Sequence, residues 1–147
     1  MLSAPESSIV IDAPALYALF YLDKKQLLEG IPDIKVTFTT VEQLHNVYCH
    51  CGDDLISMII EYIRRAENVH VISPSMESIV HNRRNYPHQV QDFYDCLNLA
   101  IQNENSFVTA YHLPLAFQQN GLPVMLPEGF KTIKIVNNEV LIFKGNA

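Results

Sequence analysis

Residues 8–22 read SIVIDAPALYALFYL, a β-branched run that ends at Asp12 and continues at once into an apolar segment. The run SIVI predicts a buried strand over residues 8–11. The segment from Ala13 to Leu22 is apolar nearly all round, which predicts a well-buried helix. A buried strand that leads directly into a buried helix is typical of α/β domains, in which helices cover both faces of a mostly parallel sheet.

Strand and helix patterns alternate along the rest of the chain. Further strand-like runs lie at Val36–Phe38, Val69–Ile72, Phe107–Val108 and Pro123–Leu126, with helical patterns between them. The last stretch, KTIKIVNNEVLIFKG, places Asn137-Asn138 between two apolar runs and predicts a β-hairpin. We therefore expect a three-layer α/β sandwich with a parallel sheet of about four strands over residues 1–130. The C-terminal hairpin, residues 131–147, is expected as an appendage of the same domain.

The composition limits the class of protein. A chain of 147 residues is one ordinary domain, and 48% hydrophobic residues are enough to build a core. Its longest apolar run is too short to span a bilayer, so we expect no membrane association. Three cysteines without a CxxC motif predict reduced thiols in a cytoplasmic protein. The net charge of −6 argues against a nonspecific nucleic-acid binder, because such proteins are usually basic.

Several carboxylates fall where a parallel sheet would gather them. Sites in such sheets lie beyond the carboxyl ends of the strands. Asp12 directly follows the first strand, and Thr109 directly follows the run Phe107–Val108. Asp92 and Asp95 share one flank of the long helix before it. Glu42 lies in the first turn of another helix, where a capping box from Thr39 to Glu42 is predicted. Each carboxylate also has a purely structural explanation as a helix cap or a partner of the helix dipole.

Clustered carboxylates predict a metal site rather than a simple acid–base pair. Neighbouring carboxylates raise one another's pKa unless a cation is bound between them. Oxygen-only ligands suit Mg²⁺ or Mn²⁺, and such ions activate water for attack at phosphorus. We expect Asp12, Glu42 and Asp95 to hold the metal, with Asp92 as a fourth carboxylate and Thr109 orienting a ligand or water.

The same residues resemble a known family. The order SSIVIDAPAL, TTVEQL, DFYDCLNLAI and SFVTAYHLPLAFQQNGLPV is similar to the PIN domain over residues 8–126. The resemblance implies a metal-dependent endoribonuclease, often the toxin of a toxin–antitoxin pair. The family's acidic positions carry over onto Asp12, Glu42 and Asp95.

One position departs from the family pattern. Tyr111 stands where the fourth acidic residue is expected, and its hydroxyl stays protonated near neutral pH. Asp92 is a candidate replacement. The alternatives are a catalytically inactive PIN-like module that binds a protein partner or RNA, and an unrelated α/β binding domain whose carboxylates are only caps.

A polar segment before the long helix is the best candidate for RNA contact. Arg83 and Arg84 suit phosphate binding, and Tyr86 is able to stack on a base. The structural alternative is an ordinary solvated loop. RNA as substrate and an antitoxin or other protein as partner follow from the resemblance, and a homodimer is compatible with it.

Overall fold

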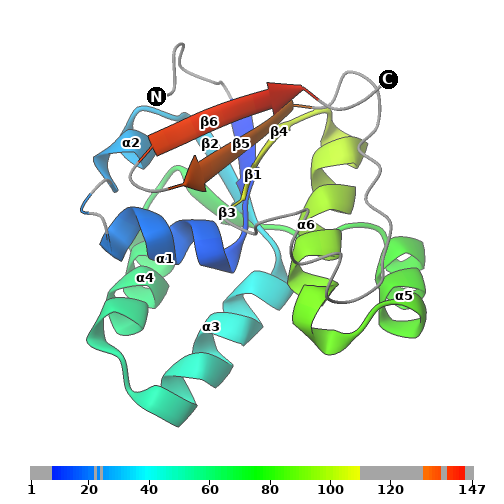
Figure 1. Ribbon diagram of the computed structural model, residues 1–147, viewed down its shortest axis with the longest axis horizontal. Coiled ribbons are helices and arrows are strands. Elements are labelled where there is room, and N and C mark those ends of the chain that lie inside the picture. The colour runs from blue at the N-terminus through cyan, green and yellow to red at the C-terminus, as the bar shows by residue number, and fades with distance from the viewer. Residues whose placement is uncertain (1–7, 22, 24, 110–130, 137–138, 145–147) are drawn as a thin grey trace.

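The computed structural model describes residues 8–21, 23, 25–109, 131–136 and 139–144. Helices and strands alternate through most of this length (Figure 1). In chain order they are β1 (Ser8–Ile11), α1 (Ala13–Tyr21), α2 (Gln26–Glu29), β2 (Asp33–Val36), α3 (Phe38–Cys51), α4 (Asp54–Arg65), β3 (Val69–Val71), α5 (Met76–Asn85), α6 (His88–Asn103), β4 (Ser106–Thr109), β5 (Lys131–Val136) and β6 (Glu139–Lys144).

The strands form one sheet in the order β3-β2-β1-β4-β5-β6. Strands β1, β2, β3 and β4 pair in parallel, as the alternation of strands and helices predicts. β5 is parallel to β4, and β6 pairs with β5 in the antiparallel sense at the far edge. The chain is therefore an α/β domain. The strand predicted at 123–126, the turn at 137–138 and Tyr111 lie outside the described residues.

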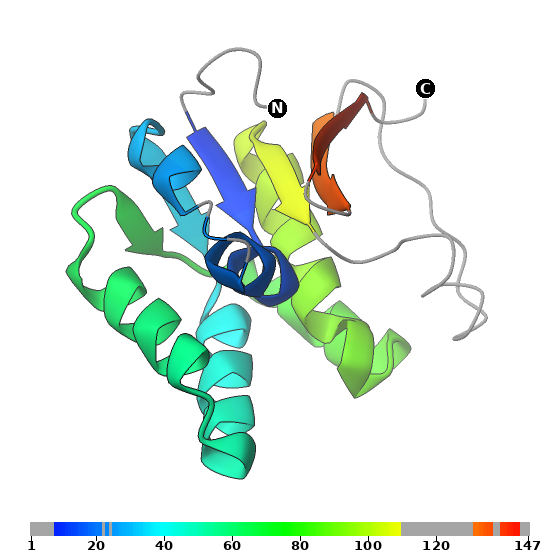
Figure 2. The same cartoon turned by 60° about the vertical axis from the view of Figure 1, so that its left-hand side comes forward.

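Helices cover both faces of the sheet (Figure 2). Ile9 and Ile11 of β1 pack with α1, α2, α3 and α4 in one apolar cluster. Val10 points to the opposite face and packs with Phe93, Phe107 and other residues of α6 and β4. Side chains of neighbouring residues on a strand point to opposite faces, so this fully buried run supplies both cores.

The start of α3 differs from the sequence prediction in an informative way. We expected a strand at Val36–Phe38 and a capping box from Thr39 to Glu42, and both predictions were wrong. β2 ends at Val36, and Thr37 is the N-cap, because its hydroxyl accepts a hydrogen bond from the backbone N–H of Thr40. Thr39 and Thr40 direct their hydroxyls to aspartates of α6 instead.

The polar segment predicted as a loop over Asn82–Pro87 is largely helical. Ser75 caps α5, which continues through Asn85. Asn82 is buried and donates hydrogen bonds to Asp95 and Asn98 of α6, which holds this last part of α5 in place. Arg83 and Arg84 therefore lie on a helix, where their directions are set by the helical repeat.

Candidate functional site

The candidate site lies where the strand order reverses. β2 and β3 follow on one side of β1, whereas β4 lies on its other side. Ligands of open α/β sheets bind at such a switch point, outside the carboxyl ends of the strands. Asp12 directly follows β1 and Thr109 ends β4, so both lie at this point. The Thr109 hydroxyl donates a hydrogen bond to Oδ2 of Asp12, and both side chains are fully buried.

Asp12 also acts as the cap that its position predicts. Its Oδ1 accepts a hydrogen bond of 2.9 Å from the backbone N–H of Ala15 in the first turn of α1. The structural and the functional interpretations of Asp12 are thus compatible, because one oxygen caps α1 while the other meets β4.

Asp92 joins three elements at the same end of the sheet. Its Oδ2 accepts a hydrogen bond of 3.1 Å from the backbone N–H of Ala13, the residue after Asp12. Its Oδ1 accepts one of 2.5 Å from the hydroxyl of Thr40, at the start of α3. Asp92 is 2% exposed. One carboxylate of α6 therefore ties the first turns of α1 and α3 together.

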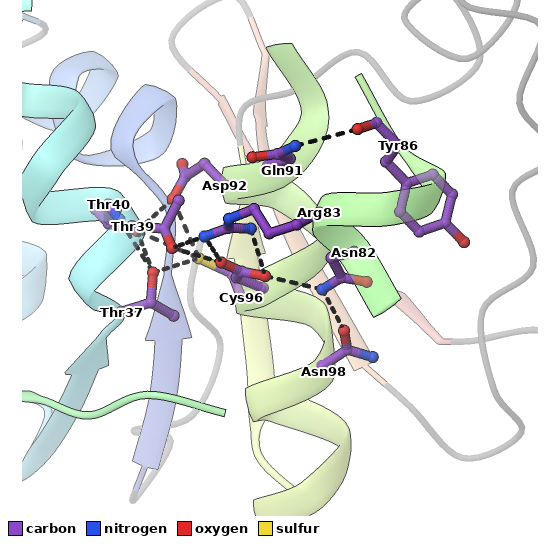
Figure 3. Close-up of polar contacts among 11 residues, drawn as sticks. Thr37, Thr39, Thr40, Asn82, Arg83, Tyr86, Gln91, Asp92, Cys96 and Asn98 are labelled. Carbon is purple, nitrogen blue, oxygen red and sulfur yellow. Dashed lines mark hydrogen bonds and ion pairs between the residues drawn. The ribbon is translucent and has the colours of Figure 1, made fainter. Parts of the chain in front are cut away.

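Asp95 lies one turn further along α6 and is enclosed by donors. Arg83 approaches it with Nη2 at 2.9 Å from Oδ2 and Nη1 at 3.4 Å from Oδ1. Asn82 donates to Oδ1 at 2.8 Å, and the Thr39 hydroxyl donates to Oδ2. Figure 3 shows Thr39, Arg83 and Asn82 converging from α3 and α5 onto α6. Asp95 is 0% exposed, so these donors replace water around it.

We call Asp12, Asp92 and Asp95 the carboxylate cluster. Burial raises the pKa of Asp92, and the neighbouring charge of Asp95 raises it further, although hydrogen bonds from Thr40, Ala13 and Cys96 act in the opposite direction. The net result is a raised pKa, as expected for a buried carboxylate beside another. The cluster therefore brings together the acidic groups whose meeting the sequence predicted.

Cys96 lies next to the carboxylate cluster. Its thiol is completely buried and lies 3.3 Å from the Thr40 hydroxyl and 3.7 Å from Oδ1 of Asp92. Burial raises the pKa of the Cys96 thiol well above its usual value, and the charges of Asp92 and Asp12 raise it further. Because the thiolate is the reactive form, this cysteine is an inert core residue rather than a nucleophile.

The structure does not bring every predicted residue to the cluster. Glu42 is exposed, and no hydrogen bond or ion pair joins it to the described residues. Arg84 is also exposed. Tyr86 is half-buried and stacks on Tyr94, with ring centroids 3.7 Å apart and planes at 4°. Two of the three residues proposed for RNA contact thus have partners within the protein: Arg83 pairs with Asp95, and Tyr86 stacks on Tyr94.

Sequence reasoning missed the donors around the aspartates. Thr39 and Asn82 donate hydrogen bonds to Asp95, and Thr40 donates one to Asp92, but none of the three was predicted as part of the site. One signal was available for the threonines: they follow β2 directly, so the rule that selected Asp12 also selects the residues after Val36. Nothing in the local sequence marks Asn82.

A divalent ion does not fit the cluster as it stands. The ligand type is right, because oxygen-only carboxylate groups suit Mg²⁺ or Mn²⁺. However, every carboxylate oxygen of the cluster already accepts a hydrogen bond from a protein group. Within the described part of the chain, no group of three or more His, Cys, Asp or Glu residues is placed to hold a metal ion.

No family model matches the chain, and no curated protein matches it. Among the described residues, no helix combines the length and apolar character needed to cross a membrane.

Proposed function

We propose that the chain is a PIN-like domain whose carboxylate cluster is structural and which serves to bind a protein partner. The observation that carries this proposal is the enclosure of the carboxylate cluster by donors of the protein itself. Asp12, Asp92 and Asp95 are at most 2% exposed, and each oxygen accepts a hydrogen bond from the protein itself. A metal-dependent nuclease needs an open coordination position for water and substrate, which such a closed arrangement does not offer.

The same contacts argue for a protein rather than RNA as the partner. Arg83 is paired with Asp95, and Tyr86 stacks on Tyr94, so neither is free to hold a phosphate or a base. The net charge of −6 opposes phosphate binding. It favours a partner that carries basic groups, because complementary charge speeds and orients association.

A groove between α1, α3 and α4 is the surface that we assign to this partner. It has a volume of about 260 Å³ and is lined by Tyr17, Leu44 and Val47, with Asp53 beside them. Val47 is 42% exposed, so the groove presents an apolar side chain to solvent. The groove suits an apolar side chain of the partner, and the net charge of −6 favours a basic segment around that side chain.

A second candidate is a Mg²⁺- or Mn²⁺-dependent endoribonuclease with a PIN-like site. The observation that favours it is that Asp92 and Asp95 lie near Asp12 although they are distant along the chain. Asp92 accepts a hydrogen bond from the backbone of Ala13, which is 79 residues away. Three buried carboxylates at a switch point are more acidic groups than capping alone requires. This candidate requires an ion to replace some of the protein groups that donate hydrogen bonds to the three carboxylates.

An RNA-cleavage assay separates the two candidates. The native chain, Asp12→Asn and Asp95→Asn are incubated with single-stranded RNA, with and without Mn²⁺, after thermal melting has established that each is folded. The proposal expects no cleavage under any condition. Cleavage that needs Mn²⁺ and is lost in both variants would replace it with the nuclease. A contaminating enzyme is recognised because its cleavage survives both substitutions.

The groove is tested by comparing what immobilised variants retain from a cell lysate. Val47→Glu places a charge in the groove, whereas Met58→Glu places one on an exposed side chain outside it. We expect a protein that the native chain and Met58→Glu retain and Val47→Glu loses. If every retained protein also binds Val47→Glu, the groove is not the interface.

A further inference from the structure

The cation that faces the carboxylate cluster belongs to the protein itself. The Arg83 guanidinium contacts both oxygens of Asp95 and donates a further hydrogen bond of 2.9 Å from Nη2 to the Thr39 hydroxyl. The Asp95 side chain is 0% exposed, and that of Arg83 is 38% exposed. The guanidinium thus reaches a buried carboxylate from the surface and closes it toward solvent.

Arginine is suited to this place for a physical reason. Its planar fork matches the two oxygens of a carboxylate, and it keeps its charge at every pH that proteins tolerate. A buried carboxylate needs a positive partner, because leaving it unpaired in a medium of low dielectric constant is costly. A divalent ion bound to Asp95 would meet the same need, so the two cations compete for one carboxylate.

The element that carries Arg83 is attached separately from the apolar core. No residue of α5 belongs to either of the two apolar clusters. Its hydrogen bonds to α6 include those from Asn82 to Asp95 and Asn98 and from Gln102 to Ser78, and Gln102 also binds the N-cap Ser75. Segments held by few apolar contacts open at lower free energy than the core does. Arg83 therefore reaches Asp95 from a helix that lies outside both apolar clusters.

We propose that Arg83, carried on α5, is a built-in counter-cation that keeps divalent ions away from Asp95 and so holds the carboxylate cluster closed. This inference rests on the proposed function and names the residue responsible for the closed state. It explains why a cluster with the right ligand chemistry does not form a metal site: an internal guanidinium already occupies the carboxylate that an ion would share with Asp92 and Asp12.

The test measures Mn²⁺ binding directly, by titration with electron paramagnetic resonance detection of free Mn²⁺. The variants are Arg83→Met, which keeps the aliphatic stem but removes the charge, and Arg83→Lys, which keeps a charge without the fork. Arg84→Met is the matched control, because Arg84 is the adjacent arginine and is exposed. Thermal melting with and without Mn²⁺ provides a second readout that does not depend on catalysis.

We expect Arg83→Met to bind Mn²⁺ at least about tenfold more tightly than the native chain, since a nearby unit charge is worth more than one factor of ten in affinity. Arg83→Lys should fall between the two, and Arg84→Met should match the native chain. If Arg83→Met fails to fold, Arg83→Lys still tests the inference, because this variant is also expected to bind Mn²⁺ more tightly than the native chain does. The inference is overturned if no folded Arg83 variant binds Mn²⁺ more tightly than the native chain, or if Arg84→Met gains as much affinity for Mn²⁺ as the Arg83 variants do.

Failure of this inference is distinguishable from failure of the proposed function. Tight Mn²⁺ binding with metal-dependent RNA cleavage by the native chain would contradict both the silent module and the role of Arg83. An inactive native chain whose Arg83 variants gain no affinity for Mn²⁺ would contradict the role of Arg83 alone.

Discussion

Replacing Arg83 by methionine should lower the free energy of unfolding by an amount that depends on how deeply the ion pair with Asp95 is buried. Removing one partner of a fully buried pair costs about 3–5 kcal/mol, and an exposed pair contributes about 0–1 kcal/mol. Here Asp95 is 0% and Arg83 38% exposed, so the pair lies between these limits. We expect a loss of about 2 kcal/mol, which lowers the melting temperature by about 6 °C for a chain of this size.

The assay is a double-mutant cycle followed by thermal and urea unfolding. It compares the native chain with Arg83→Met, Asp95→Asn and the double variant, with Arg84→Met as the surface control. The double variant should lose less than the sum of the two single losses, because once Asp95 is neutral the methionine no longer leaves a buried charge unpaired. The reasoning is refuted if Arg83→Met and Arg84→Met melt within about 1 °C of each other, a difference expected of ordinary surface substitutions.

Three further predictions follow from the cluster and its surroundings. Because the pKa of Asp92 is raised in the folded protein, the folded state binds its proton more tightly than the unfolded state does. The free energy of unfolding should therefore fall as the pH rises from the usual carboxylate range through the raised value, and Asp92→Asn should remove this part of the pH dependence in urea titrations. Thr37→Ala should cost about 1 kcal/mol in urea unfolding, because it removes the cap of α3, and Thr37→Ser should restore most of this loss. A thiol reagent should label Cys49 and Cys51, which are exposed, but label the buried Cys96 only after unfolding; labelling of all three in the native protein would contradict the buried position of Cys96.

The features that were predicted correctly all have a local cause. The strand at residues 8–11 and the helix after it follow from a β-branched run and a continuous apolar segment, which act through neighbours along the chain. The site rule also succeeded, because Asp12 and Thr109 end neighbouring parallel strands and must lie close together.

The wrong predictions concern segments whose local sequence is compatible with more than one structure. Three threonines lie within residues 37–40, and each is a good cap. A capping box with Glu42 favoured Thr39, but Thr39 and Thr40 bind Asp95 and Asp92, which are 56 and 52 residues away, and Thr37 caps the helix. The segment 82–85 looked like a loop because it is polar, and it is helical because Asn82 has buried partners on α6.

The sequence by itself determined the α/β class, the buried first strand and the edge of the sheet at which the acidic residues lie, because these depend on periodicity and on chain order. Only the tertiary structure decided which side chains meet there. It placed Arg83 on Asp95 and left Glu42 in solvent, since the partner of a buried charge depends on how helices far apart along the chain pack together. The exclusion of water strengthens the attraction between the two charges, and no segment of the chain excludes water alone.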